Sequence, residues 1–455
     1  MKTRVLVPSG ALGLNYDKVA LYNGLKQKPD IIAIDGGSTD SGPSYLGQGI
    51  SKYSRASTKA EWKGLMEARE VANIPLLIGT AGTCGTDTAV DWFLKITQEI
   101  ARELNQSLKI VIIRCSQSNK EVINAYSDQK IEPLPNAPEL SIDVISRCTN
   151  IVALAGVEQV IDALKEKPDI IIAGRTTDTA IIAALPIMRG IDPGTAWHGA
   201  KIAECGALCT TNPLSGVIMV EFNFDNFTVE PMHVDAKATP KTVSAHMLYE
   251  NTNPYILFEP GGYLDTKEST YKAETNKKVR VAGAKWNKSD KYTVKLEGTI
   301  LTGFQNISIT ILRNNRYVKK AKEWADDICL QCTKLIRCRL ELDDHEFSIE
   351  LRLIGQNASF GKLEVKKATL FEIGVMALVT AQTQQLADEI SQMLNPFLLH
   401  HPLTKSEELP TFSFPFSPAD IQRGSIYSFC FHHTLELNDP LEIFRKEVIN
   451  IDQSL

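Results

Sequence analysis

Three glycine-rich loops in the first half of the chain each carry hydroxyl side chains and an aspartate, a combination suited to ligand chemistry. The loops are Asp35–Pro43 (DGGSTDSGP), Gly79–Asp87 (GTAGTCGTD) and Gly174–Ala180 (GRTTDTA). Glycine lets backbone amides approach a ligand closely, and serine or threonine can cap a following helix, whose amide end favours an anion. Because the phrase KPDII precedes both the first and the third loop, we expect these loops to serve one site.

The residue types in these loops indicate how a small anionic substrate would be held. Arg175 supplies the planar guanidinium donors that suit a carboxylate or a phosphate. The residues that we expect to bind the substrate come from all three loops: Gly36, Gly37, Ser38, Thr39, Gly82, Thr83, Gly85, Thr86, Asp87, Arg175, Thr176 and Thr177. The same residue types also suit ordinary strand-to-helix turns, but three such loops in one domain favour a site.

Three carboxylates are candidates for catalysis. Asp178 or Asp40 is expected to act as the base, since each belongs to one of the two loops that follow KPDII. Glu204, in AECG at a predicted helix end, is expected to act as the acid or as an orienting group. His198 and Cys205 in the same segment are explained equally well as packed residues.

We assign no metal site from the sequence, and the cofactor stays open. One CxxC motif has a third cysteine nearby but no second pair, which falls short of a zinc site: Cys329, Cys332 and Cys338. His432 and His433 are adjacent in a predicted strand and therefore face opposite sides. Asp35, Asp40 and Asp87 offer the oxygen ligands that magnesium prefers, although loop aspartates are commoner than metal sites.

The elements that must position these loops alternate between strand and helix. Short apolar runs predict strands at Arg4–Gly10, Ile31–Ile34, Ile74–Thr80, Lys109–Cys115 and 169–174, with helical patterns between them. Strands without polar alternation are typical of a mainly parallel sheet with helices on both faces. Ligands bind at the carboxyl ends of such strands, which is where all three loops lie.

The second half of the chain has a different sequence pattern, in which apolar strands no longer alternate regularly with helices. We therefore expect an α/β ligand-binding or catalytic domain at 1–215 and an α+β domain at 216–455 that covers the cleft, with a ferredoxin-like fold as one alternative for the second domain. Within it the pattern predicts helices at Asn315–Leu335 and Phe371–Leu394 and a strand at Arg339–Leu353. The aromatic segment Tyr249–Asp265 is expected to reach towards the glycine loops and exclude water from them.

Residue composition, net charge and cysteine content limit the classes of protein to which this chain can belong. The chain has 455 residues, 43% of them hydrophobic and 23% charged, which is ordinary for a globular protein. A net charge of -5 argues against a nucleic-acid partner or an anionic membrane surface. Nine cysteines without regular spacing favour a reduced, cytoplasmic protein. Apolar edge strands in the second half must be covered, either by the first domain or by a second copy in a homo-oligomer.

Several phrases, spread over nearly the whole chain, resemble the acyclic terpene utilisation (AtuA-like) family. They are PDIIAIDGGSTDSGPSYLG, PLLIGTAGTCGTD, PDIIIAGRTTDTA, AKIAECGA, SAHMLYENTNPYILFEPGGYLD and FPFSPADIQRGSIYSFCFHHTLELNDP. The resemblance implies a role in the catabolism of branched acids and acyl thioesters, and it carries over no agreed catalytic residues. Members often have GRVAD, so Arg175 and Asp178 match that pattern, while Thr176 and Thr177 depart from it.

The leading hypothesis is an enzyme that acts on a small carboxylic acid or acyl thioester, such as an acyl-CoA, by acid–base catalysis. Addition or removal of water (hydratase or lyase chemistry) or isomerisation fits best, because redox and nucleotide-hydrolysis signatures are not found in the sequence. A hydrolase that uses aspartate- or metal-activated water is the second hypothesis. The third is a non-catalytic subunit that binds a ligand or joins a complex.

Overall fold

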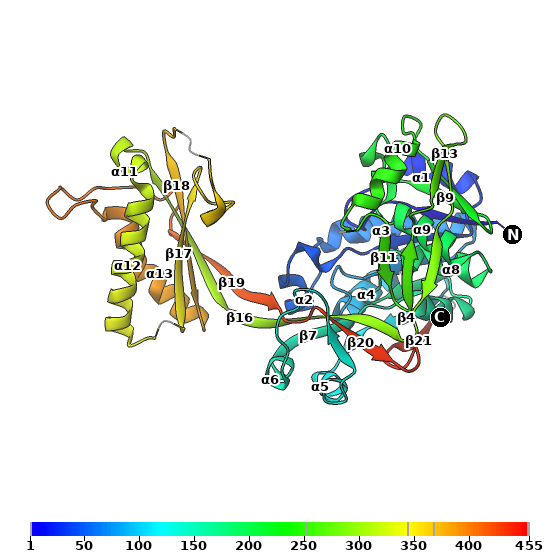
Figure 1. The fold of residues 1–455 in the computed structure, drawn as a ribbon, viewed down its shortest axis with the longest axis horizontal. Helices are drawn as coiled ribbons and strands as arrows, with labels where there is room; N and C mark the ends of the chain where they lie inside the picture. Colours follow the sequence, from blue (N-terminus) through cyan, green and yellow to red (C-terminus); the bar gives the residue numbers. More distant parts are fainter. Residues whose placement is uncertain (1, 252, 344, 367–368, 453–455) are drawn as a thin grey trace. The chain divides into compact units, whose positions relative to one another are not determined.

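The computed structural model describes residues 2–251, 253–343, 345–366 and 369–452 (Figure 1). The chain divides into two compact units, which are residues 1–300 with 429–455 (the first unit) and residues 301–428 (the second unit). This division lies well beyond the boundary expected near residue 216. The physical reason is strand pairing, since Ile218–Phe222 (β9) pairs antiparallel with Thr3–Val7 (β1) and so completes the sheet of the first unit.

A mixed ten-stranded sheet forms the centre of the first unit. Its order is β13-β14-β10-β9-β1-β2-β3-β8-β4-β21. The middle strands are parallel: β1, β2 (Ile31–Asp35), β3 (Leu76–Gly79), β8 (Ile170–Ala173) and β4 (Leu108–Arg114). Antiparallel strands flank them: β9, β10 (Asn226–Pro231), β14 (Val279–Ala282), β13 (Thr270–Ala273) and β21 (Arg445–Ile451).

Helices cover both faces of this sheet, because the middle strands are apolar on both sides. Val5 and Ile31 face a core that they share with α7 (Val157–Lys165), α8 (Ala180–Met188) and α9 (Pro193–Ala203). Leu6 and Ile32, the next residues along, face a second core that is shared with α1 (Lys18–Lys26), α3 (Arg55–Ala72) and α4 (Asp87–Leu104). Helices therefore cover both faces as expected, but the sheet is mixed and not mainly parallel, because antiparallel strands extend it on both sides of the parallel middle strands.

Further elements of the first unit pack around this sheet. One group is built on the first part of β16 (Tyr292–Leu312), which pairs with β7 (Cys148–Ala153) and β20 (His433–Leu437). The smaller elements are α2 (Ser44–Gln48), β5 (Ser116–Gln117), α5 (Asn119–Ser127), β6 (Ile131–Pro133), α6 (Ile142–Ser146), α10 (Pro240–Ala245), β11 (Ile256–Glu259), β12 (Gly262–Asp265) and β15 (Lys285–Lys288). The pairing of β16 sets Glu297 opposite Val152 and so fixes its place in the first unit.

The second unit is a sheet covered on one face by helices. Its strands are the last part of β16, β17 (Phe347–Ile354), β18 (Ile373–Ala381) and β19 (Asp420–Phe429), in the order β17-β18-β16-β19. The helices are α11 (Asn315–Lys319), α12 (Ala321–Leu340) and α13 (Gln384–His400). Trp324 and Leu394 from the helices share one core with Val375 from the sheet. The elements follow the order strand, helix, strand, strand, helix, strand of the ferredoxin-like motif.

One expectation in this unit is wrong. The segment Phe371–Leu394 is not a single helix, since Ile373–Ala381 forms strand β18 and α13 begins at Gln384. Burial along β18 alternates residue by residue, which is the period of a half-buried strand. Thr383 accepts a hydrogen bond from the Leu386 amide and caps the helix. The expected strand Arg339–Leu353 also begins later, at Phe347, because α12 continues to Leu340.

No helix in the described part of the chain combines the length and the apolar character that crossing a membrane requires.

Candidate active site

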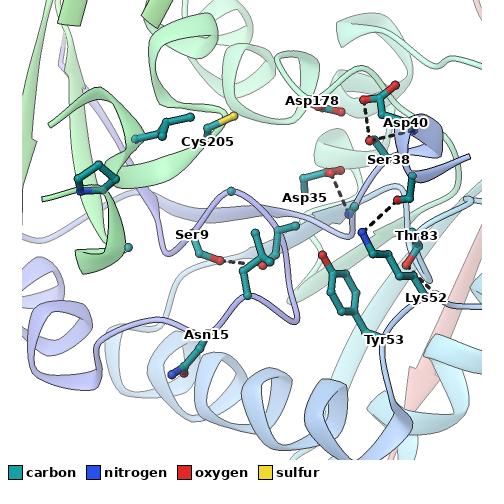
Figure 2. A pocket seen from close by; sticks show the side chains of 18 of the residues that line it. Ser9, Asn15, Asp35, Ser38, Asp40, Lys52, Tyr53, Thr83, Asp178 and Cys205 are labelled. Carbon is teal, nitrogen blue, oxygen red and sulfur yellow. Dashed lines mark hydrogen bonds between the residues drawn. The ribbon is translucent and has the colours of Figure 1, made fainter. Parts of the chain in front are cut away.

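The first and third glycine loops meet at one edge of the central sheet. Both β2 and β8 pair in parallel with β3, so their carboxyl ends point the same way. Asp40 and Asp178, which follow these strands, line one pocket of about 410 Å³ in the first unit (Figure 2). The two KPDII phrases therefore lead to one site, as the sequence predicts.

The predicted site residues fall into two groups, according to whether they line this pocket. Those that line the pocket are Gly37, Ser38, Asp40, Thr83 and Asp178. Those outside its lining are Gly36, Thr39, Gly82, Gly85, Thr86, Asp87, Arg175, Thr176, Thr177 and Glu204. The second group packs the loops against one another and against the helices that follow them.

The glycines illustrate this packing. A Cβ atom on Gly85 would lie 2.3 Å from the Arg175 amide nitrogen, and one on Gly36 would lie 2.4 Å from the Thr80 carbonyl oxygen. Both positions require glycine because another strand-end loop passes too close for a side chain. Gly37 has φ of 114° and directs its amide to a carboxylate of the pocket, Asp35.

Asp35, the last residue of β2, forms part of the pocket floor, and the catalytic assignment from sequence did not include it. One of its carboxylate oxygens accepts a hydrogen bond from the Gly37 amide at 2.9 Å. The other makes no hydrogen bond within the described residues, although the side chain is almost fully buried. Burial, and then the neighbouring Asp178, raise the pKa of Asp35 well above its ordinary value. The signal in the sequence was an aspartate that ends an otherwise apolar strand.

Asp178 lies across the pocket from Asp35 and interacts with it electrostatically (Figure 2). Its carboxylate is 3.7 Å from a terminal nitrogen of Arg175. Burial raises the pKa of Asp178, and the nearby Arg175 only partly offsets this effect. Two carboxyl groups that share one poorly solvated site resist ionising together, so the ionisation of one opposes that of the other.

Arg175 lies outside the pocket lining, and its side chain is almost fully buried and already paired. Its Nε and one terminal nitrogen donate to Glu297 at 2.9 and 3.2 Å. The other terminal nitrogen donates to the Thr176 carbonyl and the Thr80 hydroxyl. Burial opposes the ionisation of Glu297, but Arg175 outweighs this and lowers the pKa of Glu297 to about 2. The expected anion-binding arginine is therefore the centre of an internal ion pair.

Thr39, which also lies outside the lining, belongs to this ion pair. Its hydroxyl donates to the Glu297 carboxylate at 3.0 Å. Lys295 donates to the other Glu297 oxygen at 3.2 Å. Glu297 comes from β16, far along the chain, and nothing in the local sequence around it marks it as a partner of the loops.

One side of the pocket mouth is more exposed and carries a positive charge. Ser38 donates its hydroxyl to the exposed Asp40 carboxylate at 2.7 Å. Lys52 donates to the Ser41 hydroxyl at 3.1 Å (Figure 2). Burial, and then the charge of Asp35, raise the pKa of the pocket-lining Tyr53. Among the described residues that line the pocket, Lys52 is the cationic side chain.

The middle loop is mainly structural. Thr83 lines the pocket and accepts a hydrogen bond from the Lys52 amide at 3.2 Å. Thr86 caps α4 by accepting from the Ala89 amide. Asp87 turns away from the pocket, where it accepts from the Ser116 amide and forms an ion pair with Arg445. In the third loop, the Thr177 hydroxyl accepts from the amide of Ala180, the first residue of α8, and the buried Thr176 supplies its carbonyl oxygen to Arg175.

A second group of buried charges lies at the end of α9. Lys201 forms an ion pair with Glu204, and both side chains are almost fully buried. Burial raises the pKa of Glu204 to about 8, while Lys201 acts in the opposite direction. Glu259, in the aromatic segment that follows α10, accepts a hydrogen bond from Thr179 of the third loop, and burial raises its pKa to about 7. Between these groups, Cys205 reaches the pocket lining.

The mouth of the pocket also carries apolar side chains. Leu14, Leu208 and Leu214 line it and are 61%, 39% and 96% exposed. Tyr249 and Glu250 line it as well, so the segment that was expected to reach the glycine loops does so at its first residues. An acidic floor beneath an apolar rim suits a substrate with a polar reacting group and a hydrocarbon chain.

Comparison with known proteins identifies the family. Searches of curated proteins and of solved structures found no match. The family model described as "Acyclic terpene utilisation family protein AtuA" matches residues 71–225 and 226–412, which together make up most of the chain. The matched range includes the second and third loops, Asp178, Glu297 and the segment around His246. This protein therefore belongs to the acyclic terpene utilisation family AtuA.

Proposed function

We propose that this protein is an enzyme of acyclic terpene catabolism that catalyses proton transfers on an acyl substrate, by adding or removing water or by moving a double bond. The observation that carries the proposal is the pair Asp35 and Asp178, which line one pocket from two different strand ends. Coupled carboxyl groups whose environments disfavour double ionisation supply an acid and a base at the same time.

The two carboxyl groups have complementary roles in this scheme. In the hydration direction the ionised carboxylate removes a proton from water, and the water oxygen bonds to the β-carbon of an unsaturated acyl group. The protonated carboxyl then delivers its proton to the α-carbon. Dehydration reverses these steps, and isomerisation uses the proton transfers without the water. Arg175, held by Glu297, positions Asp178.

The lining of the pocket favours a neutral acyl carbonyl, such as that of a thioester, over a free carboxylate as the reacting group. Four carboxyl groups line the pocket: Asp35, Asp40, Asp178 and Glu250. Their charge repels a substrate carboxylate at close range. Leu208 and Leu214 on the rim suit a branched hydrocarbon chain, and the exposed Lys52 can meet an anionic remainder such as the phosphates of an acyl-CoA.

Hydrolysis is the second candidate function. The same excess of carboxyl groups is able to activate a water molecule directly or to hold a divalent cation that activates it. Hydrolysis of a thioester releases a free thiol, whereas hydration and isomerisation keep the thioester intact. The two functions are therefore separated by their products.

The test is a panel of branched, unsaturated acyl thioesters and the matching free acids, incubated with the full-length protein in D₂O. We expect deuterium at the α-carbon or addition of water to the thioesters, measured by mass spectrometry. Asp178→Asn should abolish the exchange, and Cys338→Ser, at an exposed thiol of the second unit, should not change it. Release of thiol would favour the hydrolase. Saturable binding of a thioester without exchange, hydration or thiol release would overturn the proposal in favour of a binding subunit.

A further inference from the structure

Three side chains beside the acid–base pair converge in a way that the proton-transfer chemistry does not use. Glu204 comes directly after α9 as its C-cap residue, Cys205 follows it, and His246 comes directly after α10. One possible ligand atom from each of them, namely a carboxylate oxygen, the sulfur and a ring nitrogen, lies within 4.8 Å of the other two. Two helix ends that are about 40 residues apart in sequence thus bring together three different donor types.

His246 supplies the observation that points to a ligand. The side chain is 4% exposed, and its Nε2 makes no hydrogen bond within the described residues. The backbone of Lys201 also interacts with the ring. A buried ring nitrogen without a hydrogen-bond partner is available to bind a metal ion, as the neutral imidazole of histidine commonly does.

The ring of His246 is also held in place. It stacks on Tyr249 with the ring centroids 5.5 Å apart and an angle of 15° between the planes. A buried nitrogen that is fixed in orientation and left without a partner costs free energy, and a bound cation would remove that cost.

We propose that Glu204, Cys205 and His246 bind a zinc ion or a similar transition-metal ion, with a further coordination position open to the pocket. Zinc takes thiolate, imidazole and carboxylate ligands at about 2.0–2.3 Å, and three protein ligands are usual where the ion keeps a position for water or substrate. Cys205 lines the pocket, and Figure 2 shows its sulfur on the side that faces Asp178. The site goes beyond the Asp35–Asp178 chemistry and does not depend on it.

The surrounding charges favour a cation in spite of Lys201. Its ammonium group pairs with one oxygen of Glu204 and leaves the other oxygen for the ion. Asp178 and Glu259 interact electrostatically with Glu204 and add negative charge nearby. With Cys205 ionised on binding the metal, the negative groups around this point outnumber the single ammonium group.

The experiment is a titration of the full-length, chelator-treated protein with Co²⁺, which reports on its own ligands. We expect one equivalent to give a thiolate-to-cobalt charge-transfer band and the visible bands of a four-coordinate ion, both displaced by Zn²⁺. Cys205→Ser should remove the charge-transfer band. His246→Gln and Glu204→Gln should each weaken binding at least about 10-fold. Cys338→Ser, which removes an exposed thiol outside the cluster, is the matched control and should keep the full band.

Folding is followed by circular dichroism in the same samples. If His246→Gln does not fold, Cys205→Ser and Glu204→Gln still decide the question, because each changes few atoms. The site is refuted if the folded wild type shows no charge-transfer band, or if Cys205→Ser keeps the band undiminished. Since metal binding is read directly, a negative result leaves the acid–base function standing, and inactive Asp178→Asn protein should still bind the metal.

Discussion

The strands β2 and β8 both begin within the phrase KPDII, but the charged residues at their carboxyl ends have opposite signs. β2 ends in Asp35, a nearly buried pocket-lining carboxyl group, one oxygen of which has no hydrogen-bond partner within the described residues. β8 continues into Arg175, a buried cation whose nitrogens are occupied by Glu297 and by loop oxygens. One copy of the phrase therefore leads to a buried acid whose neighbours offset its burial only in part, and the other leads to a buried cation that is paired with a carboxylate.

The difference between Asp35 and Arg175 shows how the charges of such a site are set. Similar glycine- and threonine-rich loops follow both strands, yet the groups that set their charge come from other parts of the chain. Glu297 on β16 neutralises Arg175, whereas the charge with the largest effect on the pKa of Asp35 is another carboxylate, Asp178, which Arg175 opposes. Local sequence similarity thus predicts that both loops lie at the same edge of the sheet. The residues that contact each loop from other parts of the chain decide its electrostatics.

The largest expected effect concerns the aspartates of the two loops. Asp178→Asn should reduce kcat by about 10²–10⁴-fold, the usual range for loss of a general acid or base. Asp40→Asn should cost less than about 10-fold, because Asp40 is exposed and bonded to Ser38 at the mouth. Steady-state kinetics on the substrate found by the deuterium screen would measure both. Equal losses would mean that the two loops contribute alike.

The second expected effect is on stability and tests the ion pair between Arg175 and Glu297. Arg175→Met should lower the free energy of unfolding by about 3–5 kcal/mol, since it leaves Glu297 buried without its main partner. The double variant Arg175→Met/Glu297→Gln should recover part of this loss. Urea unfolding is the measurement, with Lys52→Met, at an exposed ammonium group, as the control at no more than about 0.5 kcal/mol. A loss below about 1 kcal/mol for Arg175→Met would show that Glu297 does not depend on it.

The third expected effect is that Asp35 and Glu297 make the stability of the fold depend on pH in opposite directions. Because burial and Asp178 raise the pKa of Asp35, the folded protein keeps this proton after the unfolded chain has released it. Stability therefore falls as pH rises from the ordinary aspartate value through the raised one. Glu297 behaves in the reverse manner, since its pKa is lowered from 4.5 to about 2 and its contribution is lost as pH falls through that range.

Asp35→Asn separates these contributions. At about pH 8 the variant should be more stable than the wild type by about 1–3 kcal/mol, because folding no longer requires either a proton to be taken up or a charge to be buried at this position. At about pH 4, near the ordinary aspartate pKa, the two proteins should differ little. Urea unfolding at the two pH values gives the comparison. A gap that is the same at both would show that Asp35 ionises normally in the fold.

The smallest effect concerns the loop hydroxyl groups. Thr177→Val removes an oxygen that accepts from the Ala180 amide at the start of α8, so it should cost about 1 kcal/mol. Ser38→Ala in the first loop should cost less, because Ser38 caps only the short turn at Thr39–Ser41. Thermal unfolding would rank the two. A larger loss for Ser38→Ala would show that its hydrogen bonds at the pocket mouth support the fold more than the Thr177 hydroxyl does.

Three expectations failed or fell short for reasons that can be named. GVMALVTA lies in a run that also suits a helix, and only pairing of β18 with β16 and β17 decides that Ile373–Ala381 is a strand. Asp35 was first considered as a metal ligand because the sequence does not show whether a strand-end carboxylate is buried. Asp87 lies in the predicted loop, but the nearby Ser116 and Arg445 bind it away from the pocket.

The sequence by itself determined the apolar strands, the helices that alternate with them and the glycine loops at their carboxyl ends, because these depend on local periodicity and turn chemistry. It also identified the family. Only the tertiary structure decided which polar groups meet. Glu297 reaches Arg175, Asp178 faces Asp35, and His246 joins Glu204 and Cys205 through contacts between distant segments. Burial and charge pairing set the pKa and the availability of each group, and neither is written in the residues on either side of it.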